Sequence, residues 1–392
     1  MMPQSRPERR HIAILSPLQR KPGRTQGGLE VVVTHIANAL SQKGLQVDIL
    51  VMPPKGGDPI PPDLDERIEI INLKSKHKLI GLFTLVDYLR SRQPDLLLAA
   101  GHRSNMLALR AKRLLPRPPC VILGVHNMLS RQMSQFNPLK RWLRSRTISR
   151  YYPRSDAVIA VSHGVAEDLG QRFGLPQNLI HTIHNPVVTD ELFRLAEQSP
   201  EHPWFHDSGP PVILSVGRLR PQKDFTTLIK AFHIVRQQRD CRLLILGEGR
   251  ERPTLETLVN DLGLQLEIQL PGFIANPLPC MKQAALFVLS SAWEGFGNVL
   301  VEALSTGVAV VSTDCPSGPR EILEDGRLGA LVPVGDANAL ATAMLETLET
   351  PPDRDLLIES ARRFSVERAS TAYMDLLTKC HTTQIDTGTA NG

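Results

Sequence analysis

Short apolar runs alternate along this chain with longer segments in which apolar residues recur every three or four positions. The first run spans residues 11–16, and a helical period follows from Leu29 to Lys43, where Gly44 provides a suitable end. Uninterrupted apolar runs are typical of parallel strands buried on both faces, and the longer period is typical of helices that cover them. The pattern therefore predicts a parallel sheet with helices on both of its faces.

This alternation occurs twice, which predicts two domains. Residues 185–210 separate the two series; they contain four prolines and no clear period, and we interpret them as a linker. We predict an α/β fold of two Rossmann-like, doubly wound domains that face each other across a cleft, with ligands at the carboxyl ends of the strands. The strands are expected near residues 11–16, 47–52, 95–100, 120–125 and 157–161, and then near 211–217, 243–247, 268–270, 286–290 and 309–312.

The chain of 392 residues is long enough for both domains. We assign residues 1–190 to the first domain and residues 205–365 to the second. A helix over 366–380 is expected to pack back on the first domain, and the polar residues 381–392 are expected to form a disordered tail.

Composition narrows the class of protein. Hydrophobic residues make up 42% and charged residues 22% of the chain, and no apolar run is long enough to span a membrane. The apolar run at 11–15 is too short for the core of a signal peptide, so we expect a cytoplasmic protein. The five cysteines are far apart and lack metal-ligand spacing, which predicts neither a disulfide framework nor a metal site.

The net charge of +5 is unevenly distributed. Residues 1–200 carry a net charge of +12, and residues 201–392 carry a net charge of −7. This division suggests domains with different partners, and the basic half could face phosphate, nucleic acid or an anionic membrane.

The sharpest cluster of candidate site residues lies at 293–302 and reads Trp-Glu-Gly-Phe-Gly-Asn-Val-Leu-Val-Glu. Its two glycines permit close backbone approach to a ligand, and the helix expected from Asn298 offers N–H groups to an anion. Glu294 in the loop and Glu302 on the helix could each grip vicinal hydroxyls, such as those of a sugar. A capping loop with two solvated glutamates fits this segment equally well.

A second cluster begins at Gly217, after the first apolar run of the second series. Arg218 and Lys223 are five residues apart on this loop and could neutralise a diphosphate. An ordinary basic surface loop is the alternative interpretation.

The first domain offers a glycine pair, Gly27 and Gly28, at a strand-to-helix loop, which again permits close approach to a ligand. His126 ends a buried strand and could donate to a sugar hydroxyl or to a developing oxyanion, although a lone histidine is more often structural. His163 and His184 occupy similar places and are weaker candidates.

Taken together, these segments resemble glycosyltransferase family 4, whose members have the GT-B fold. The resemblance extends from Gly27 to Leu331, with the motifs in the family's order. The loop Asp314-Cys-Pro-Ser-Gly-Pro-Arg-Glu321 replaces the commoner Gly-Gly-x-Pro-Glu and resembles a variant in bacterial enzymes that build surface or lipid-linked glycans. The matching motifs are Glu294-Gly-Phe-Gly-Asn-Val-Leu-Val-Glu302, Gly217-Arg218 with Lys223, Gly27-Gly28-Leu-Glu30, Val161-Ser162, Asn185-Pro186, and Gly326 with Gly329.

The resemblance implies a division of roles in a site for a nucleotide-sugar donor. Glu302 would bind the ribose and Glu294 the donor sugar, while Arg218 and Lys223 would bind the diphosphate. His126 would approach the sugar from the first domain, and Gly28 would lie beside the donor. Backbone amides would hold the sugar and phosphates at Phe296, Gly297, Asn298 and Val299.

By the same resemblance, the enzyme would retain the anomeric configuration, and the leaving diphosphate would accept the proton of the acceptor. Arg218, Lys223 and a helix N-terminus would stabilise the departing charge, so neither a metal nor another cofactor is expected. We expect transfer of a hexose or N-acetylhexosamine from a nucleotide-sugar, with UDP as the nucleotide, to a glycan or lipid-linked acceptor.

The segment 139–152 bears on the acceptor. It places Leu139, Trp142, Leu143 and Ile148 among five basic residues, a pattern that suits peripheral contact with an anionic membrane. A helix packed on its own domain with a solvated basic face is the alternative.

Two other functions remain open from sequence. A sugar phosphorylase or a nucleotide-sugar epimerase could use a similar two-domain frame. A nucleic-acid-binding protein could use the basic half, but no helix-turn-helix, finger or RNA-binding aromatic motif supports it.

Overall fold

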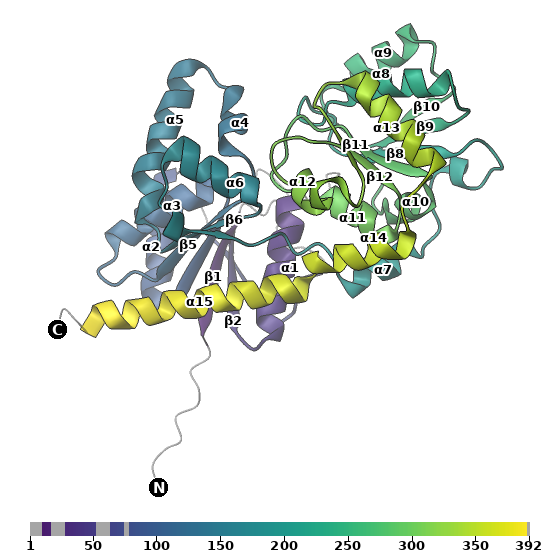
Figure 1. Cartoon of the computed structure of the whole chain (residues 1–392). Helices are drawn as coiled ribbons and strands as arrows, with labels where there is room; N and C mark the ends of the chain where they lie inside the picture. Colours follow the sequence, from purple (N-terminus) through teal and green to yellow (C-terminus); the bar gives the residue numbers. More distant parts are fainter. Residues whose placement is uncertain (1–9, 17–27, 52–62, 74–77, 390–392) are drawn as a thin grey trace. The chain divides into compact units, whose positions relative to one another are not determined.

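The computed structural model describes residues 10–16, 28–51, 63–73 and 78–389 of the chain (Figure 1). The chain divides into two compact units, one made of residues 1–186 and 366–392 and the other of residues 187–365. Each unit is a parallel sheet covered by helices, which confirms the predicted α/β fold class with two Rossmann-like domains.

The first domain contains a seven-stranded sheet in the order β3-β2-β1-β4-β5-β6-β7, and every pairing is parallel. Apart from the edge strands β3 and β7 and the exposed Gln46 that opens β2, its strand residues are buried, as expected for strands covered on both faces. The strands are β1 His11–Ser16, β2 Gln46–Val51, β3 Glu69–Asn72, β4 Leu96–Ala100, β5 Cys120–Val125, β6 Ala157–Ala160 and β7 Ile180–Thr182.

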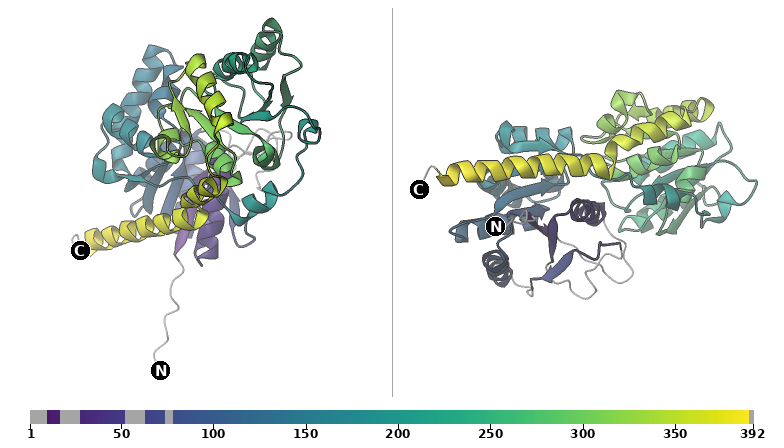
Figure 2. Two further views of the ribbon diagram at one scale, coloured as in Figure 1. Left: turned by 45° about the vertical axis from the view of Figure 1, so that its right-hand side comes forward. Right: turned by 90° about the horizontal axis from the view of Figure 1, so that it is seen from below.

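Helices cover this sheet, and the last helix of the chain is one of them. Helix α15 packs on α1 and reaches β5, and Tyr373, Leu376 and Leu377 belong to the same hydrophobic cluster as the strands (Figures 1 and 2). It also extends past residue 380, because no proline interrupts the polar end of the segment; residues 390–392 lie outside the described residues. The helices are α1 Gly28–Gln42, α2 Lys78–Arg92, α3 His102–Leu114, α4 Leu129–Ser134, α5 Pro138–Tyr151, α6 His163–Glu167 and α15 Val366–Thr389.

The second domain contains a six-stranded parallel sheet in the order β10-β9-β8-β11-β12-β13. Its strands are β8 Val212–Val216, β9 Arg242–Leu246, β10 Ile268–Gly272, β11 Leu286–Leu289, β12 Val310–Thr313 and β13 Ala330–Val332. Its helices are α7 Asp190–Ala196, α8 Phe225–Arg236, α9 Arg252–Asp261, α10 Leu278–Gln283, α11 Asn298–Thr306, α12 Pro319–Ile322, α13 Ala337–Glu349 and α14 Arg354–Ala361.

Both sheets reverse their strand order at one place, between β1 and β4 in the first domain and between β8 and β11 in the second. At such a switch point the connections on either side leave in opposite directions, so the loops beyond the carboxyl ends of these strands diverge and make room for a ligand. The topology therefore gives each domain one favoured place for a binding site.

The chain crosses between the domains twice, after Pro186 and after Ser365. On the second-domain side the two crossing segments are bonded together, since the Val187 and Val188 amides donate to Phe364 O at 2.9 and 3.1 Å. Among the described residues, no helix has both the length and the apolar character needed to cross a membrane.

The segment interpreted as a linker is largely part of the second domain. It contains helix α7, and Asn276 donates to Leu195 O at 2.9 Å, while His202 lies 2.9 Å from Gln269 Oε1. Its prolines and its lack of a period reflect short elements that pack on the domain and do not reflect a loose connection.

Three strands were not predicted, and all three lie at sheet edges: β3, β7 and β13. The residues of β7 are only partly buried, and those of β3 include exposed positions. An edge strand has a neighbour on one side only, so its sequence does not need the uninterrupted apolar run that marks a central strand.

A polar cluster is buried at the amino-terminal side of the first sheet. Asp48 on β2 accepts a hydrogen bond from the Tyr88 hydroxyl at 2.6 Å, and its Oδ2 lies 2.9 Å from His11 Nε2. Burial by itself raises the pKa of the Asp48 carboxyl, but the bonds from His11 and Tyr88 outweigh burial and hold the pKa below its ordinary value of 3.8. The stabilisation from this carboxylate is therefore present above that value and is lost as the pH falls through the lower pKa of the folded state.

We predict that Tyr88→Phe lowers the free energy of unfolding of the first domain by about 1–2 kcal/mol, because a buried carboxylate loses a donor. Amide hydrogen exchange in β1 and β2 under native conditions measures this domain separately. Tyr151→Phe is the matched control, since the Tyr151 hydroxyl has no hydrogen-bond partner among the described residues. Equal effects of the two substitutions would contradict the role given to the Tyr88 hydroxyl.

Candidate functional site

The candidate site of the second domain is formed by three loops at one edge of its sheet. The loops follow β8, β11 and β12, which are neighbours in the sheet, and β8 and β11 flank the switch point. They carry the predicted residues of 217–224 and 293–298 together with the loop that begins at Asp314. The order of the strands therefore brings the clusters at 217–224 and 293–302 side by side.

Lys223 and Glu294 form an ion pair across the switch point. Lys223 Nζ lies 2.6 Å from Glu294 Oε1, and the side chains are 17% and 8% exposed. A carboxylate that is this buried needs a partner, because an unpaired buried charge costs several kcal/mol. Two residues for which we expected separate ligands, the diphosphate and the donor sugar, are thus bonded to each other.

Two residues that the sequence analysis missed fix the orientation of Glu294. The Ser291 hydroxyl donates to Glu294 Oε1 at 2.6 Å, and the Gln222 amide donates to Trp293 O at 2.9 Å and lies 3.4 Å from Glu294 Oε2. Oε1 therefore accepts two short hydrogen bonds, while Oε2 has one long contact and keeps its capacity to accept from a ligand. The only sign of this role in the sequence is that Ser291 lies three residues before Glu294, within reach of its carboxylate.

Further bonds between the loops hold the site rigid. The Ala292 amide donates to Gln222 O at 2.8 Å, and the Ser317 hydroxyl donates to Gly295 O at 2.7 Å. Gly318 has φ +95°, and a Cβ there would lie 1.7 Å from Phe296 O, so the loop after β12 can approach only as glycine. The unusual loop that begins at Asp314 thus supports the backbone of the glycine-rich segment.

Helix α11 begins in this segment with its first turn free of a side-chain cap. Gly297 precedes it with φ +103°. The Phe296 side chain is buried at 2% exposure and packs edge-on against Phe364, with ring centroids 5.2 Å apart. Phe296 can therefore offer a ligand only its backbone, and the N–H groups at Asn298 and Val299 lie at a helix N-terminus, where an anion is favoured.

Glu302 lies on α11, one turn after the helix begins. Its carboxylate makes no hydrogen bond or ion pair within the described residues, and burial raises its pKa to about 7, opposed by the charge of Lys223. A half-buried carboxylate without a protein donor can accept hydrogen bonds from a ligand.

Arg218 differs from Lys223 in its surroundings. It is exposed, and its guanidinium has no hydrogen-bond or ion-pair partner in the part of the chain that the structure describes. The site thus has one cation held by a carboxylate and one that is free to meet an anion.

The candidate residues of the first domain lie at the corresponding edge of its sheet. His126 follows β5 and bonds to the side chain of Asn185, while its Nδ1 is buried without a partner among the described atoms. Burial lowers the pKa of His126 to about 4, so the ring is neutral near pH 7. Gly28 is the exposed first residue of α1, and Gly27 lies outside the described residues.

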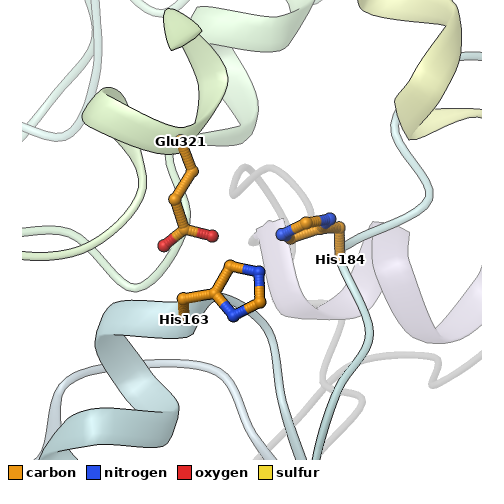
Figure 3. Close-up of side chains that lie close together, drawn as sticks. All are labelled: His163, His184 and Glu321. Atoms are coloured by element: carbon orange, nitrogen blue, oxygen red, sulfur yellow. The ribbon is translucent and has the colours of Figure 1, made fainter. Parts of the chain in front are cut away.

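His163 and His184 face each other within the first domain. Their rings are nearly perpendicular, with centroids 5.8 Å apart (Figure 3). His163 begins α6 and His184 directly precedes Asn185, the partner of His126. Glu321, also drawn in Figure 3, belongs to α12 of the second domain.

Two pairs of carboxylates have the Asp-x-Asp spacing that can suit a metal ion: Asp353 and Asp355 at the start of α14, where Asp353 accepts from the Leu356 amide at 2.9 Å, and Asp63 and Asp65. Asp65 Oδ1 accepts from Arg67 Nε at 2.9 Å, and Asp65 Oδ2 accepts from Arg67 Nη2 at 2.6 Å. This arginine lowers the pKa of Asp65 to about 2. Since both oxygens of Asp65 are bonded to an arginine, this pair forms a turn and does not present an open metal site.

Two family models match the chain, one for each domain. The model described as Glycosyltransferase Family 4 matches residues 26–191, and the model described as Glycosyl transferases group 1 matches residues 199–364. The first range covers the first sheet, and the second contains the whole candidate site of the second domain.

Among curated proteins, the chain is 36% identical over 202 residues to N-acetylgalactosamine-N,N'-diacetylbacillosaminyl-diphospho-undecaprenol 4-alpha-N-acetylgalactosaminyltransferase of Campylobacter jejuni. That match covers 52% of this chain and 53% of the relative, so the chain spans about half of that protein's length. The lipopolysaccharide core biosynthesis glycosyltransferase LpsE of Rhizobium meliloti is 28% identical over 370 residues, which cover 90% of this chain and 96% of the relative.

A solved structure supports the fold. The Anabaena protein HepE in complex with UDP-glucose superposes with a TM-score of 0.75 at 20% identity, covering 94% of this chain and 99% of that one. With both domains matched in order and the GT-B fold shared, this protein belongs to the glycosyltransferases of family 4.

Proposed function

We propose that this enzyme is a retaining, metal-independent glycosyltransferase that moves a hexose or N-acetylhexosamine from a UDP-sugar to a glycan or lipid-linked acceptor. The observation that carries the proposal is the arrangement around Lys223 and Glu294 at the switch point of the second domain. It combines two cations, an uncapped helix N-terminus and two carboxylates with unused acceptor capacity.

A nucleoside diphosphate suits the cationic part of the site. Arg218 offers a planar guanidinium that has no partner in the described part of the chain, and Lys223 has two ammonium protons beyond the one directed to Glu294. The N–H groups at the start of α11 add partial positive charge. HepE, a protein with the same fold, was crystallised with UDP-glucose, which supports a nucleotide-sugar as donor.

The two glutamates suit the two sugar rings of such a donor. Glu302 accepts from no donor among the residues that the structure describes, and in this proposal it accepts from the ribose hydroxyls. Glu294 accepts from the transferred sugar through Oε2, because Oε1 is already bonded to Lys223 and Ser291.

The proposed reaction breaks the bond between the anomeric carbon and the diphosphate oxygen. An acceptor hydroxyl forms a new bond to that carbon on the same face, and the leaving diphosphate takes the hydroxyl proton. Arg218, Lys223 and the start of α11 stabilise the charge that develops on the diphosphate, so no metal is required in this scheme. His126, neutral near pH 7, would donate to a hydroxyl of the sugar.

The relatives support a lipid-linked or lipopolysaccharide acceptor. The acceptor in the name of the Campylobacter relative is a diphospho-undecaprenol, and LpsE is named for synthesis of the lipopolysaccharide core. Such acceptors have long lipid chains, so an enzyme that uses them needs access to a membrane surface.

Helix α5 of the first domain fits that need. Leu139, Trp142 and Leu143 are spaced to share one face of the helix and are 67%, 56% and 51% exposed, although most apolar side chains are buried. Residues 126–155 contain seven basic and no acidic residues. We therefore assign α5 to peripheral contact with the anionic inner face of the cell membrane.

The nucleotide assignment is tested by thermal shift with UDP, GDP, ADP and TDP, with and without EDTA. Stabilisation by UDP that persists in EDTA is the expected result, because the site supplies its own cations. Stabilisation that depends on a metal would contradict metal independence. Release of sugar phosphate from a glycan with inorganic phosphate, and no nucleotide binding, would favour a phosphorylase.

Arg218→Ala and Lys223→Ala should each weaken UDP binding about 10- to 100-fold, because each removes a charge-assisted contact to the diphosphate. Only Lys223→Ala should also lower the melting temperature without ligand, since it leaves Glu294 unpaired. Lys230→Ala, on the exposed side of α8, is the control. Near-normal turnover of either site variant would contradict the assignment of that residue to the diphosphate.

UDP affinity should increase with pH between 6 and 8, because Glu302 must be ionised to accept two hydrogen bonds and its pKa is about 7. We expect about a tenfold change from this group alone. UDP itself titrates in this range, so the comparison is with Glu302→Gln, which keeps the contribution of the ligand. An equally steep pH dependence in Glu302→Gln would show that the carboxylate has no part in it.

Vesicle pelleting tests the role of α5. The wild-type protein should pellet with phosphatidylglycerol vesicles at low salt, and Trp142→Ser should weaken this binding roughly tenfold by removing apolar contact. Leu266→Ser is the matched control, since Leu266 is 85% exposed on the second domain. The same loss in the control, or no pelleting of the wild type, would remove this function of α5.

A further inference from the structure

Two arginines without a counter-ion come together in the first domain at the carboxyl end of β4. Arg103 lies in the first turn of α3 and is exposed, and Arg144 is partly buried on the inward side of α5. Within the described residues neither guanidinium makes a hydrogen bond or an ion pair, and Arg144 Nε is buried without a partner. Unpaired neighbouring cations repel each other, so this arrangement is costly unless an anion binds it.

The two arginines influence each other and the same neighbour. Burial is the main cause that lowers the pKa of Arg144; Tyr152 opposes it, and the positive charge of Arg103 adds to it. Burial, followed by the charges of Arg144 and Arg103, lowers the pKa of His102 to about 4. The 3.0 Å contact between His102 Nδ1 and the Tyr152 hydroxyl joins the first turn of α3 to the residue that follows α5, so the two cations belong to helices that are in contact.

Neutral polar groups lie beneath the arginines. The Tyr152 hydroxyl is 3.0 Å from His102 Nδ1 and accepts from Asn105 Nδ2 at 3.2 Å. Asn105 is fully buried and also donates to Gly124 O at 3.1 Å, but its Oδ1 has no partner among the described atoms. A buried carbonyl oxygen without a donor is costly, and a bound hydroxyl or water would satisfy it.

The backbone contributes as well. Helix α3 is 13 residues long, and no side chain caps its first turn. Gly101 precedes it with φ +88°, a conformation that favours glycine, and turns the chain sharply from β4 into the helix. The free N–H groups of this turn have the same polarity as Arg103, so helix and side chain favour an anion together.

We infer that Arg103, Arg144 and the first turn of α3 form a binding site for a phosphate or diphosphate group of the acceptor. The inference rests on the proposed function in one respect: that function is the reason for assigning the phosphate to an acceptor molecule. Every residue of this site belongs to the first domain, whereas the cations and carboxylates assigned to the donor belong to the second.

Helix α5 links this site to the proposed membrane contact. Arg144 faces α3, and its guanidinium lies over the Phe136 ring, 5.3 Å from the centroid, whereas Trp142 and Leu143 are exposed. An acceptor with its lipid in the membrane would thus have its first phosphate bound by the inward side of the helix that touches the membrane.

The test is a calorimetric titration of inorganic pyrophosphate, and separately of geranyl diphosphate, into the full-length protein saturated with UDP. UDP fills the donor site, so the remaining binding reports the first domain. We expect Arg103→Gln and Arg144→Gln each to weaken both probes about tenfold or more. Arg110→Gln on α3 and Arg141→Gln on α5, both exposed, should leave both affinities unchanged.

Arg103→Gln alters an exposed side chain, so it keeps the test valid even if Arg144→Gln fails to fold. Unchanged pyrophosphate affinity in Arg103→Gln, or an equal loss in Arg110→Gln, would overturn the inference. Phosphatidylglycerol vesicles separate a lipid headgroup from an acceptor phosphate: vesicle binding weakened by Arg103→Gln and not by Arg141→Gln, with pyrophosphate unaffected, would also overturn it. UDP binding is measured in the same titrations, so failure of the donor assignment is seen separately.

Discussion

The ion pair between Lys223 and Glu294 is the interaction on which the second-domain site depends. It joins the loops after β8 and β11 at the place where the strand order reverses. The pair gives a buried carboxylate a charged partner and at the same time holds the lysine in place, with two ammonium protons left for an anion. Ser291 and Gln222 fix the orientation of the Glu294 carboxylate, so that Oε2 is the oxygen with acceptor capacity left for a ligand.

The central part of the fold could be predicted from sequence because buried parallel strands must be apolar throughout. The edge strands β3, β7 and β13 escaped this rule, since one side of each has no neighbouring strand. The segment after Pro186 was interpreted as a linker for a similar reason: α7 is too short to establish a helical period. Both failures concern elements whose position is set by tertiary packing and not by their own sequence.

The individual residues of the candidate site were also visible in the sequence, but their bonding was not. Charged side chains such as Lys223 and Glu302 stand out after an apolar run, whereas the neutral Ser291 does not. The pairing of Lys223 with Glu294 required the order of the strands, which brings residues 71 positions apart into contact. If the proposed function holds, two local cations and one helix end attract a diphosphate to a half of the chain whose net charge is negative, so the net charge of a domain would not identify such a site.

The position of helix α15 has a consequence for the order in which the two domains complete their folding during synthesis. The strands of the first domain leave the ribosome first, but Tyr373, Leu376 and Leu377 of their hydrophobic cluster belong to the last helix of the chain. The whole second domain is synthesised in between. The first domain is therefore the first to begin folding and the last to be completed, and a fragment that ends at the first crossing would leave the surface that receives α15 open to water.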